Sequence, residues 1–282
     1  MPTTNESQEY KDFRAFLEEA CGILLGDNKA YLVNSRLKSI LQQYAIADLS
    51  ALVSKLKLPA NRQLKDDVVD AMTTNETLWF RDQHPFKLLT DRIFPELCKT
   101  LPPGKPIKIW SAACSTGQEP YSIAITAKEF QEANLGKMKS GVSITATDIS
   151  PTVIKTAQEA TYEMLALGRG MSEQRLKKCF EEKQQGSWQL KSAYKNMVNF
   201  QLLNLMESYQ KIGSAYDVIF CRNVLIYFSS ELKKQLLIKM HQCLKPGGYL
   251  MLGASESLNG LAEYYEMEQC RPGILYRAKS RP

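Results

Sequence analysis

The chain has 282 residues, 44% of them hydrophobic, which is enough for one large α/β domain and a smaller unit. Its seven cysteines are scattered without C-x-x-C spacing, and its two histidines lie far apart, at 84 and 241. These patterns argue against a disulfide framework, a metal site and a Ser-His-Asp triad. The amino terminus is polar and no run of 18 apolar residues occurs, so we expect a cytoplasmic protein without signal peptide or membrane insertion.

Residues 10–70 carry apolar side chains at helical spacing. Pro59 interrupts the pattern, which then resumes and ends near residue 72. The sequence therefore predicts a small helical domain over residues 1–72, whose buried stripes are Phe13, Phe16 and Leu17, then Leu32, Leu37, Ile40 and Leu41, then Leu49, Leu52, Val53 and Leu56, and finally Leu64, Val68, Val69 and Met72.

The net charge of the chain, which is +6, is not spread evenly along the sequence. Between Lys29 and Lys65 there are seven basic residues and one acid, Asp48, so this stretch alone contributes +6. A charge run of this kind is either a solvated helix face or a docking surface for an acidic partner.

Residues 73–105 are expected to form a linker and a lip helix between the two domains. The segment T-T-N-E-T-L-W-F-R-D-Q-H-P mixes helix-capping residues with two aromatics and leads into a helix over 86–97. The turn L-P-P-G-K-P at 101–106 then breaks the chain before the next domain.

Strands and helices alternate in residues 106–282, and this alternation predicts a doubly wound, mostly parallel sheet. A hairpin over 264–277, with Pro272–Gly273 at its turn, should return across the sheet edge, and L-K-P-G-G-Y-L-M-L at 244–252 is typical of a helix stop, a turn and a strand. The expected elements are strand 107–112, helix 119–133, strand 143–148, helix 151–160, strand 216–222, helix 230–244 and strand 248–253.

An insertion over about 161–200 breaks this alternation. It holds a charged helix, Glu173–Glu182, followed by two short stretches with strand character around turns. We expect a small antiparallel β-subdomain, which serves either for substrate or partner recognition or as a structural cap.

The segment I-K-I-W-S-A-A-C-S-T-G-Q-E-P-Y at 107–121 has the form of a nucleotide-cofactor site. A buried strand runs into a loop of small residues, which lets a ligand lie against the backbone. The loop lacks both G-x-G-x-x-G and G-x-x-x-x-G-K-[ST], so a dinucleotide or a nucleoside triphosphate is disfavoured. Glu119 would repel phosphate and attract an ammonium group, which suits S-adenosylmethionine.

Ligands of doubly wound sheets bind at the carboxyl ends of the strands, and polar residues follow several of the predicted strands. Asp148 ends a strand, where a carboxylate can bind both ribose hydroxyls or, alternatively, cap the next helix. Glu119 suits a cofactor and equally suits the first turn of a helix. Asn204–Leu205 and Arg222–Asn223 occupy comparable positions.

Two further residues have functional and structural interpretations. Arg81 follows Leu-Trp-Phe, where its guanidinium group either pairs with a carboxylate of cofactor or substrate or lies on the surface. Tyr227, in C-R-N-V-L-I-Y-F, is either a core aromatic or a hydroxyl donor at the site.

Taken together, six motifs resemble the chemotaxis receptor methyltransferase family, the CheR type, over about residues 10–277. The combination, in this order and spacing, is specific, whereas the last motif alone would indicate only some adenosylmethionine-dependent methyltransferase. The motifs are T-T-N-E-T-L-W-F-R-D, W-S-A-A-C-S-T-G-Q-E-P-Y-S-I-A, A-T-D-I-S, N-L-M, F-C-R-N-V-L-I-Y-F and L-K-P-G-G-Y-L.

The resemblance implies a class I S-adenosylmethionine methyltransferase fold, which is Rossmann-like. It implies transfer of the methyl group to glutamate carboxylates of chemoreceptor cytoplasmic helices at receptor arrays, with S-adenosylhomocysteine as the other product. Arg81 and Tyr227 are then expected near the reacting methyl group. The implied cofactor-binding residues are Asn75, Thr77, Arg81, Glu119, Asp148, Asn204, Leu205, Cys221, Arg222 and Asn223, and the implied receptor-docking residues are Arg36, Lys38, Lys55 and Lys57.

The insertion departs from the family pattern. The stretch K-Q-Q-G-S-W-Q-L-K-S-A-Y-K is shorter than in relatives whose β-subdomain holds a receptor carboxyl-terminal pentapeptide. We therefore expect recognition to rest mainly on the helical domain, with no nucleic acid as partner. Two alternatives stay open at this point, namely a methyltransferase of the same fold acting on RNA or a small molecule, and a non-catalytic adaptor that binds S-adenosylmethionine.

Overall fold

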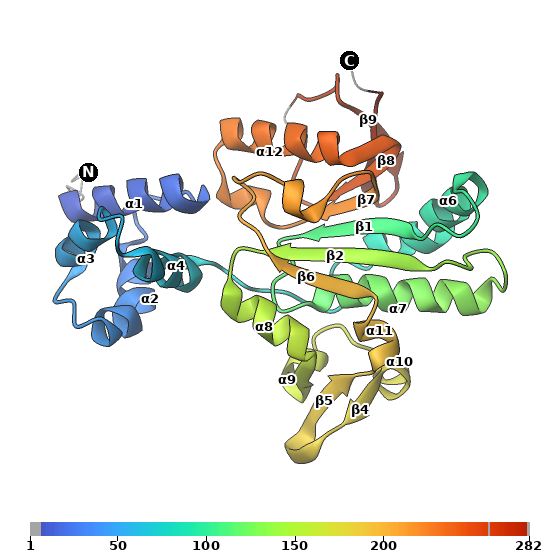
Figure 1. The fold of residues 1–282 in the computed structure, drawn as a ribbon, viewed down its shortest axis with the longest axis horizontal. Helices are drawn as coiled ribbons and strands as arrows, with labels where there is room; N and C mark the ends of the chain where they lie inside the picture. Colours follow the sequence, from blue (N-terminus) through green and yellow to red (C-terminus); the bar gives the residue numbers. More distant parts are fainter. Residues whose placement is uncertain (1–6, 259, 281–282) are drawn as a thin grey trace. The chain divides into compact units, whose positions relative to one another are not determined.

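The structure, a computed structural model, describes residues 7–258 and 260–280. The chain forms two compact units (Figure 1). The helical unit comprises Met1–Thr74 with Tyr227–Lys233, and the sheet unit comprises Asn75–Ile226 with Lys234–Pro282. Each unit is described by itself below.

The helical unit is built from four amphipathic helices, which confirms the predicted bundle. The helices are α1 (Gln8–Cys21), α2 (Ala30–Gln43), α3 (Leu49–Leu56) and α4 (Arg62–Met72). Helix α1 ends at Gly22 in the left-handed conformation, and α3 begins at Asp48, whose carboxylate accepts a hydrogen bond from the Ala51 amide. Most residues of the predicted stripes are buried, including Phe13, Leu17, Leu37, Leu52, Val68 and Met72, whereas Phe16, Leu32, Leu41 and Leu49 are half-buried.

The sheet unit contains a seven-stranded sheet of order β6-β2-β1-β7-β8-β10-β9. The first five strands in this order pair in parallel, and β10 pairs antiparallel with both of its neighbours, as expected for the carboxyl-terminal hairpin. The strands are β1 (Ile107–Ala112), β2 (Val142–Asp148), β6 (Val198–Leu202), β7 (Tyr216–Cys221), β8 (Leu244–Leu252), β9 (Tyr265–Cys270) and β10 (Gly273–Ala278).

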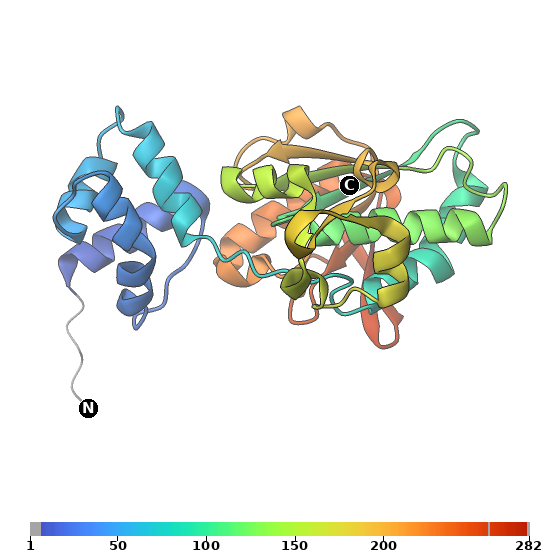
Figure 2. The same ribbon diagram turned by 90° about the horizontal axis from the view of Figure 1, so that it is seen from below.

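Helices cover both faces of this sheet, which confirms the doubly wound fold. Helix α12 (Ser230–Cys243) lies on one face, and α7 (Gln118–Ala133) and α8 (Pro151–Glu159) lie on the other (Figures 1 and 2). Nine residues of α7 between Pro120 and Phe130 are buried, so this helix is apolar nearly all round because the sheet and neighbouring helices enclose it. No helix in the described residues is long and apolar enough to cross a membrane.

The segment predicted as a linker and lip helix is part of the core of the sheet unit. It forms α5 (His84–Leu88), a π-helical turn η1 (Leu89–Ile93) and α6 (Phe94–Thr100) in direct succession. Trp79, Phe86 and Phe94 are buried in the same apolar cluster as the sheet. The sheet unit begins at Asn75, so nearly all of the segment 73–105 belongs to this unit and is not a separate linker.

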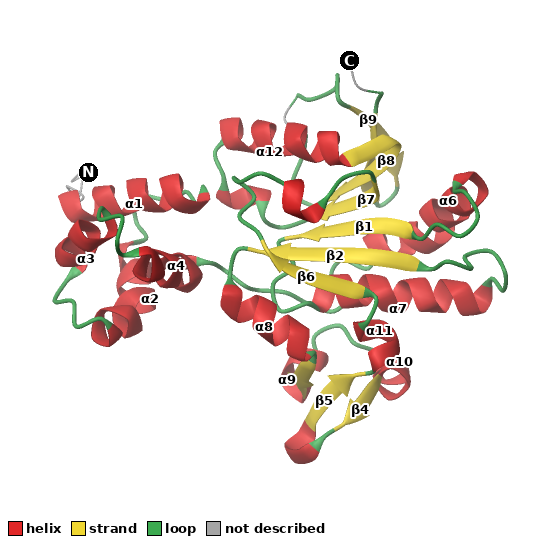
Figure 3. Cartoon of the chain, viewed as in Figure 1, coloured by secondary structure: helices red, strands yellow, loops and turns green. Residues whose placement is uncertain are grey.

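The insertion contains the expected small antiparallel sheet, of order β3-β5-β4 (Figure 3). Its strands are β3 (Thr161–Glu163), β4 (Phe180–Glu182) and β5 (Ser187–Leu190), with the short helices α9 (Met164–Leu167), α10 (Glu173–Cys179) and α11 (Ser192–Lys195) around them. The 3-10 turn η2 (Gln184–Gly186) joins β4 to β5, whereas a second 3-10 turn, η3 (Gln210–Ile212), lies outside the insertion, between β6 and β7.

Three expectations for this region and its surroundings need correction. The charged helix ends at Cys179 rather than residue 182, because Phe180 is buried and pairs with Leu190 across the small sheet. Residues 198–200 belong to β6, an edge strand of the large sheet, rather than to the insertion. Residues 244–252 form one continuous strand where a helix stop, a turn and a strand were expected. Gly247, with a φ of 77°, lies within this strand.

Candidate cofactor site

The loop after β1 has the backbone that its small residues predicted. Ala113, Ser115 and Gly117 have φ values of 60°, 49° and 92°, so the chain turns tightly through left-handed conformations. A Cβ atom on Gly117 would lie 3.0 Å from the Ala157 Cβ atom and 3.1 Å from the Tyr162 hydroxyl oxygen. Glycine is therefore needed at this position both for its conformation and for close packing.

Asp148 ends β2 and holds this loop in place. Its Oδ2 atom accepts a hydrogen bond from the Ser115 amide at 2.8 Å, and its Oδ1 atom accepts one from the Ser150 amide at 3.1 Å. The helix-cap alternative does not apply to Asp148, because the side chain that caps α8 is Ser150, which accepts from the Val153 amide. The carboxylate of Asp148 is thus buried at the junction of the first two strands.

Glu119 lies in the first turn of α7 and is nearly buried, with 13% of its side chain exposed. Its Oε1 atom accepts a hydrogen bond from the Ser111 hydroxyl at 2.8 Å, and its Oε2 atom accepts one from Arg222 Nη1 at 3.0 Å. Burial raises the pKa of Glu119, while the charge of Arg222 and the hydrogen bonds from Ser111 and Arg222 act in the opposite direction. The result is a desolvated acidic group beside the cofactor loop.

Arg222 follows β7, and its side chain is 1% exposed. Besides Glu119, its guanidinium group binds the segment before α5, because Nη2 donates to Asp82 Oδ2 at 2.6 Å and to the Arg81 carbonyl oxygen at 3.0 Å. The sequence assigned Arg222 to cofactor contact, but the structure shows its side chain committed to two protein carboxylates. Arg222 therefore fixes Glu119 and the backbone of Arg81 relative to the end of β7.

The predicted residues of the segment 75–81 lie at the edge of this group. The Asn75 carbonyl oxygen accepts a hydrogen bond from the Ser115 hydroxyl at 2.9 Å, which brings the segment to the loop after β1. Thr77 and Arg81 are partly exposed, and Arg81 Nη1 donates to the Glu76 carbonyl oxygen at 3.3 Å.

The predicted residues after β6 and β7 differ in what they offer. The Leu203 amide donates to the Asp148 carbonyl oxygen at 2.9 Å, so Asn204 and Leu205, which follow β6, begin beside the end of β2. Cys221 is fully buried, and burial raises the pKa of its thiol well above the usual value. Its side chain belongs to the core, so any role in ligand binding is restricted to its backbone. Asn223 is half-buried with a φ of 59°.

Tyr227 ends the 3-10 turn η4 (Leu225–Tyr227) and is grouped with the helical unit. Within that unit its carbonyl oxygen accepts a hydrogen bond from the Leu24 amide at 2.8 Å. Its ring is half-buried, so it is not a fully enclosed core aromatic. The pairing of Tyr227 with Arg81 stays a prediction from the family resemblance.

A cavity of about 350 Å³ lies beside Arg222 on the β8 and β10 side of the sheet unit. Of the predicted cofactor residues only Arg222 lines it, so the cavity adjoins the group around Glu119 through this one side chain. Its other walls include Asp82, His84, Leu88, Met251, Gly253, Glu256, Ile274 and Tyr276.

The four cations predicted to dock a partner have different environments. Lys38 and Lys55 are exposed and form no ion pair within the described residues. Lys57 pairs with Asp12 at 3.0 Å. Arg36 is turned toward the helical unit, where Nη1 donates to the Met72 and Thr73 carbonyl oxygens at 2.6 and 2.9 Å and Nη2 donates to the Thr74 hydroxyl. Arg36 thus binds the carboxyl end of α4, a structural role that the charge count did not reveal.

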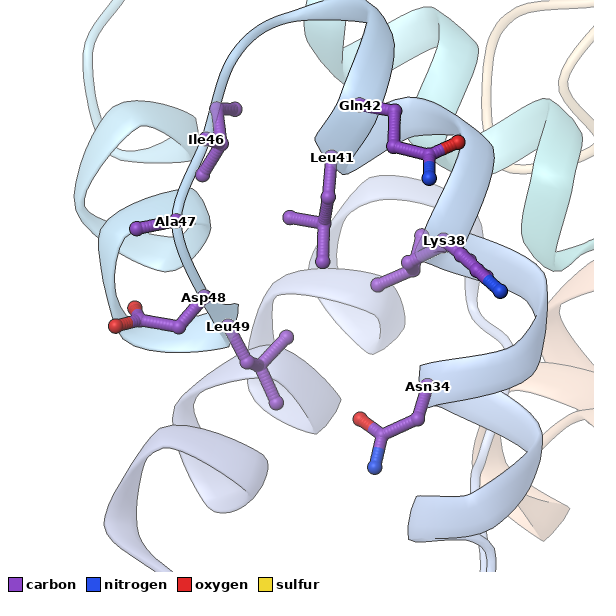
Figure 4. A pocket seen from close by; sticks show the side chains of 9 residues that line it. Asn34, Lys38, Leu41, Gln42, Ile46, Ala47, Asp48 and Leu49 are labelled. Carbon is purple, nitrogen blue, oxygen red and sulfur yellow. The ribbon is translucent and has the colours of Figure 1, made fainter.

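A groove of about 400 Å³ lies beside Lys38 on the helical unit (Figure 4). Leucine and isoleucine side chains from α2 and from the chain leading into α3 point into it, and polar side chains lie around its edge (Figure 4). The lining residues are Asn34, Leu37, Lys38, Leu41, Gln42, Ile46, Ala47, Asp48 and Leu49.

Sequence reasoning missed two side chains that organise the cofactor group, Ser111 and Asp82. Ser111 ends the apolar stretch of β1, where its hydroxyl faces Glu119, and a serine within a buried strand was a local signal for such a role. Asp82 is next to Arg81 in sequence, but its partner Arg222 is 140 residues away, so no spacing rule identifies the pair.

Comparison with known proteins agrees with this architecture. Residues 8–73 match the all-alpha domain of CheR methyltransferases, and residues 75–274 match their S-adenosylmethionine-binding domain. Chemotaxis protein methyltransferase Cher2 of Pseudomonas putida KT2440 is 50% identical over 271 residues, covering 96% of this chain and 98% of that protein. Chemotaxis protein methyltransferase 1 of Pseudomonas aeruginosa PAO1 is 51% identical with the same coverage. Chemotaxis protein methyltransferase of Vibrio parahaemolyticus is 51% identical over 276 residues, covering 98% of each chain. The chain therefore belongs to the CheR methyltransferase family.

Proposed function

We propose that this protein, an S-adenosylmethionine-dependent chemotaxis methyltransferase, binds its cofactor over the carboxyl ends of β1, β2 and β7 and methylates glutamate carboxylates of chemoreceptor helices. The observation that carries the cofactor site is that two carboxylates, the nearly buried Glu119 and the buried Asp148, adjoin the loop of small residues after β1. The match to the family's S-adenosylmethionine-binding domain covers all of these residues.

The two carboxylates suit different parts of the cofactor. Asp148 stands at the end of β2, where a carboxylate accepts hydrogen bonds from ribose hydroxyls in related sheet folds. Glu119 brings a negative charge to a desolvated position, which favours a positively charged ligand and disfavours phosphate. S-adenosylmethionine has a ribose, an ammonium group and a sulfonium group but no phosphate, so its chemistry fits this set of donors and acceptors.

Methyl transfer to glutamate makes few demands on acid–base groups of the protein. A glutamate side chain has a reference pKa near ~4.3 and is ionised at neutral pH, so it is already a nucleophile. When bound, the cofactor supplies the methyl group, which a glutamate oxygen takes while the carbon–sulfur bond breaks and sulfur keeps the electron pair. No proton moves in this step, so the protein needs no general base.

The residues of the site then act by orientation. In our proposal Arg81 and Tyr227 hold the acceptor carboxylate in line with the methyl group, and Arg222 fixes the backbone that carries Arg81. Alignment of this kind contributes on the order of 7–11 kcal/mol to a bimolecular reaction. Arg81 should bind the acceptor only moderately, because strong pairing would reduce the nucleophilicity of its oxygens.

The helical unit supplies the proposed docking surface for the receptor. Lys38 and Lys55 are exposed cations, and Lys38 lies at the edge of the groove floored by Leu37 and Leu41. A helix that presents acidic and apolar side chains complements such a surface. We place receptor recognition here, and expect no tight binding of a receptor carboxyl-terminal pentapeptide to the small sheet β3-β5-β4.

Direct titration with S-adenosylhomocysteine tests the cofactor site. Asp148→Asn keeps the size of the side chain but removes its charge and turns an amide group toward backbone N–H donors, so affinity should fall at least about tenfold. Asp66→Asn, at an exposed position of α4, is the matched control and should bind like the wild type. Equal affinity of all three proteins would show that Asp148 does not bind the cofactor. Absence of binding by the wild type would contradict the proposed site as a whole.

A further inference from the structure

Glu256, in the loop after β8, makes an unusual set of contacts, because its carboxylate accepts hydrogen bonds from four backbone amides. Oε2 accepts from the amides of Asn223 at 2.8 Å and Gly253 at 2.7 Å. Oε1 accepts from the amides of Val224 at 3.0 Å and Leu225 at 2.8 Å. Three of these donors are consecutive in the chain, so one side chain holds the whole turn that follows β7.

This turn needs such an acceptor. Asn223 has a φ of 59°, a left-handed conformation that asparagine tolerates better than most residues but that still costs some energy. The amides of residues 223–225 point to the same side and would lack partners in a partly buried position without the carboxylate. Hydrogen bonds to an ionised acceptor are stronger than neutral ones, so Glu256 can offset the strain of the turn.

Gly253 permits the contact. A Cβ atom at this position would lie 2.6 Å from Glu256 Oε2 and 2.9 Å from both the amide nitrogen and Nδ2 of Asn223. Every other residue type would therefore push the carboxylate and the turn apart. Loop residues 253–256 and the turn 223–225 are built as one assembly, although they are separated by about thirty residues in the chain.

The assembly is continuous with the cofactor group. Asn223 directly follows Arg222, whose guanidinium group binds Glu119, and Asn223 is itself one of the residues expected to contact the cofactor. Displacement of the turn after β7 would therefore move both Asn223 and the backbone atoms from which the Arg222 side chain extends.

We propose that Glu256 is a positioning residue for cofactor binding, which acts by holding the turn 223–225 so that Asn223 and Arg222 keep their places at the end of β7. This inference rests on the proposed cofactor site. Glu256 itself need not touch the cofactor, and its effect is transmitted through the backbone amides that it binds.

Three variants and one control test this role. Glu256→Gln keeps the size of the side chain but replaces one acceptor oxygen with a donor, and Glu256→Asp keeps the charge on a shorter side chain. Gly253→Ala leaves Glu256 intact but separates the carboxylate from the turn. Glu263→Gln, the same change at an exposed position, is the matched control.

Two measurements are made on each protein, namely titration with S-adenosylhomocysteine and hydrogen–deuterium exchange of the amides of 223–225 and 253. For Glu256→Gln and Gly253→Ala we expect at least tenfold weaker binding and faster exchange confined to these amides. Glu256→Asp should restore part of the affinity, because its carboxylate still offers two acceptor oxygens. Glu263→Gln should match the wild type in both measurements.

The outcomes separate this inference from the proposed site. If the wild type binds S-adenosylhomocysteine and Glu256→Gln binds it equally well, the positioning role is wrong while the site stands. If the wild type fails to bind, the proposed site itself fails. Loss of protection throughout the sheet unit in both Glu256→Gln and Gly253→Ala would overturn the inference, because Glu256 would then serve general stability and not the turn.

Discussion

Arg222 Nη1 donates to Glu119 Oε2 at 3.0 Å, and this contact joins the end of β7 to the first turn of α7. The two residues are 103 positions apart in the chain, and both side chains are shielded from solvent, with 1% and 13% of their surface exposed. Because a buried charge without a partner is costly, each residue constrains the other. The same guanidinium group also binds Asp82, so three segments of the cofactor site depend on one side chain.

Substitution of Arg222 by lysine should weaken the site without removing its charge. A lysine ammonium group cannot reach Glu119, Asp82 and the Arg81 carbonyl oxygen together in the planar geometry of arginine. We expect the free energy of unfolding to fall by about 1–3 kcal/mol and affinity for S-adenosylhomocysteine to fall at least about tenfold. Urea unfolding and calorimetric titration measure the two effects.

The control for Arg222→Lys is Arg62→Lys, which makes the same change on the exposed surface of α4. It should leave both quantities unchanged. A stability of Arg222→Lys equal to that of the wild type would show that the three contacts of Arg222 do not hold the site together.

Glu119 should leave a signature in the pH dependence of stability. Its pKa is raised chiefly by burial, so its contribution to stability is fully present below the unfolded pKa, near ~4.3, and is lost as pH rises through the folded value. Glu119→Gln removes this titration. As pH rises from about 4 through the folded pKa, the wild type should therefore lose free energy of unfolding relative to Glu119→Gln. Urea unfolding of both proteins without ligand measures this difference.

The opposite trend for Glu119→Gln would mean that the folded-state pKa of Glu119 lies below its unfolded value. Pairing with Arg222 and Ser111 would then outweigh burial. The control variant Glu263→Gln, at an exposed position, should leave the free energy of unfolding at neutral pH unchanged.

Arg36 and Lys38 lie two positions apart on α2, but substitutions at the two positions should have different effects. Arg36 binds the carbonyl oxygens of Met72 and Thr73, so Arg36→Gln should lower the stability of the helical unit by about 1–3 kcal/mol. Lys38 is exposed, and Lys38→Gln should leave thermal unfolding unchanged. Equal unfolding curves for the two variants would show that the contacts of Arg36 do not contribute to stability.

Much of the fold could be predicted because its signals are local. The apolar alternation of Ile107 and Ile109 and the helical stripes of the amino-terminal residues mark their elements directly. Strand character was predicted for residues up to 200, but their assignment to the insertion was wrong, because β6 is an edge strand in which only Phe200 is buried and its alternation is weak. The end of α10 was misplaced because the turn from helix to strand at Phe180 depends on pairing with Leu190, a tertiary contact.

The residues of the candidate site also fall into two groups, those that local sequence signals predict and those whose roles depend on tertiary contacts. Glu119 and Asp148 each follow a recognisable strand, so the topology of a parallel sheet predicts that they meet. The roles of Arg222, Arg36 and Glu256 depend on partners that, apart from the Gly253 amide, lie 31 to 141 residues away along the chain. Residue type and spacing identify such side chains as polar, but only the folded chain shows what they bind.

The docking proposal predicts that receptor methylation and cofactor binding can be separated. The double variant Lys38→Glu and Lys55→Glu reverses two exposed charges of the helical unit and should reduce the rate of receptor methylation at least tenfold at physiological salt. Its affinity for S-adenosylhomocysteine should stay unchanged. Lys139→Glu, an exposed position after α7, is the control. Undiminished receptor methylation by the double variant would place docking elsewhere.

Transfer of labelled methyl groups from S-adenosylmethionine to receptor-rich membranes tests the central claim most directly. The wild-type protein should label the receptors, and mild alkali should release the label as methanol, because glutamate methyl esters hydrolyse readily while methylated amines do not. The Asp148→Asn variant should label weakly and Asp66→Asn normally. Label that is absent with the wild type, or that resists alkali, would contradict methylation of glutamate carboxylates.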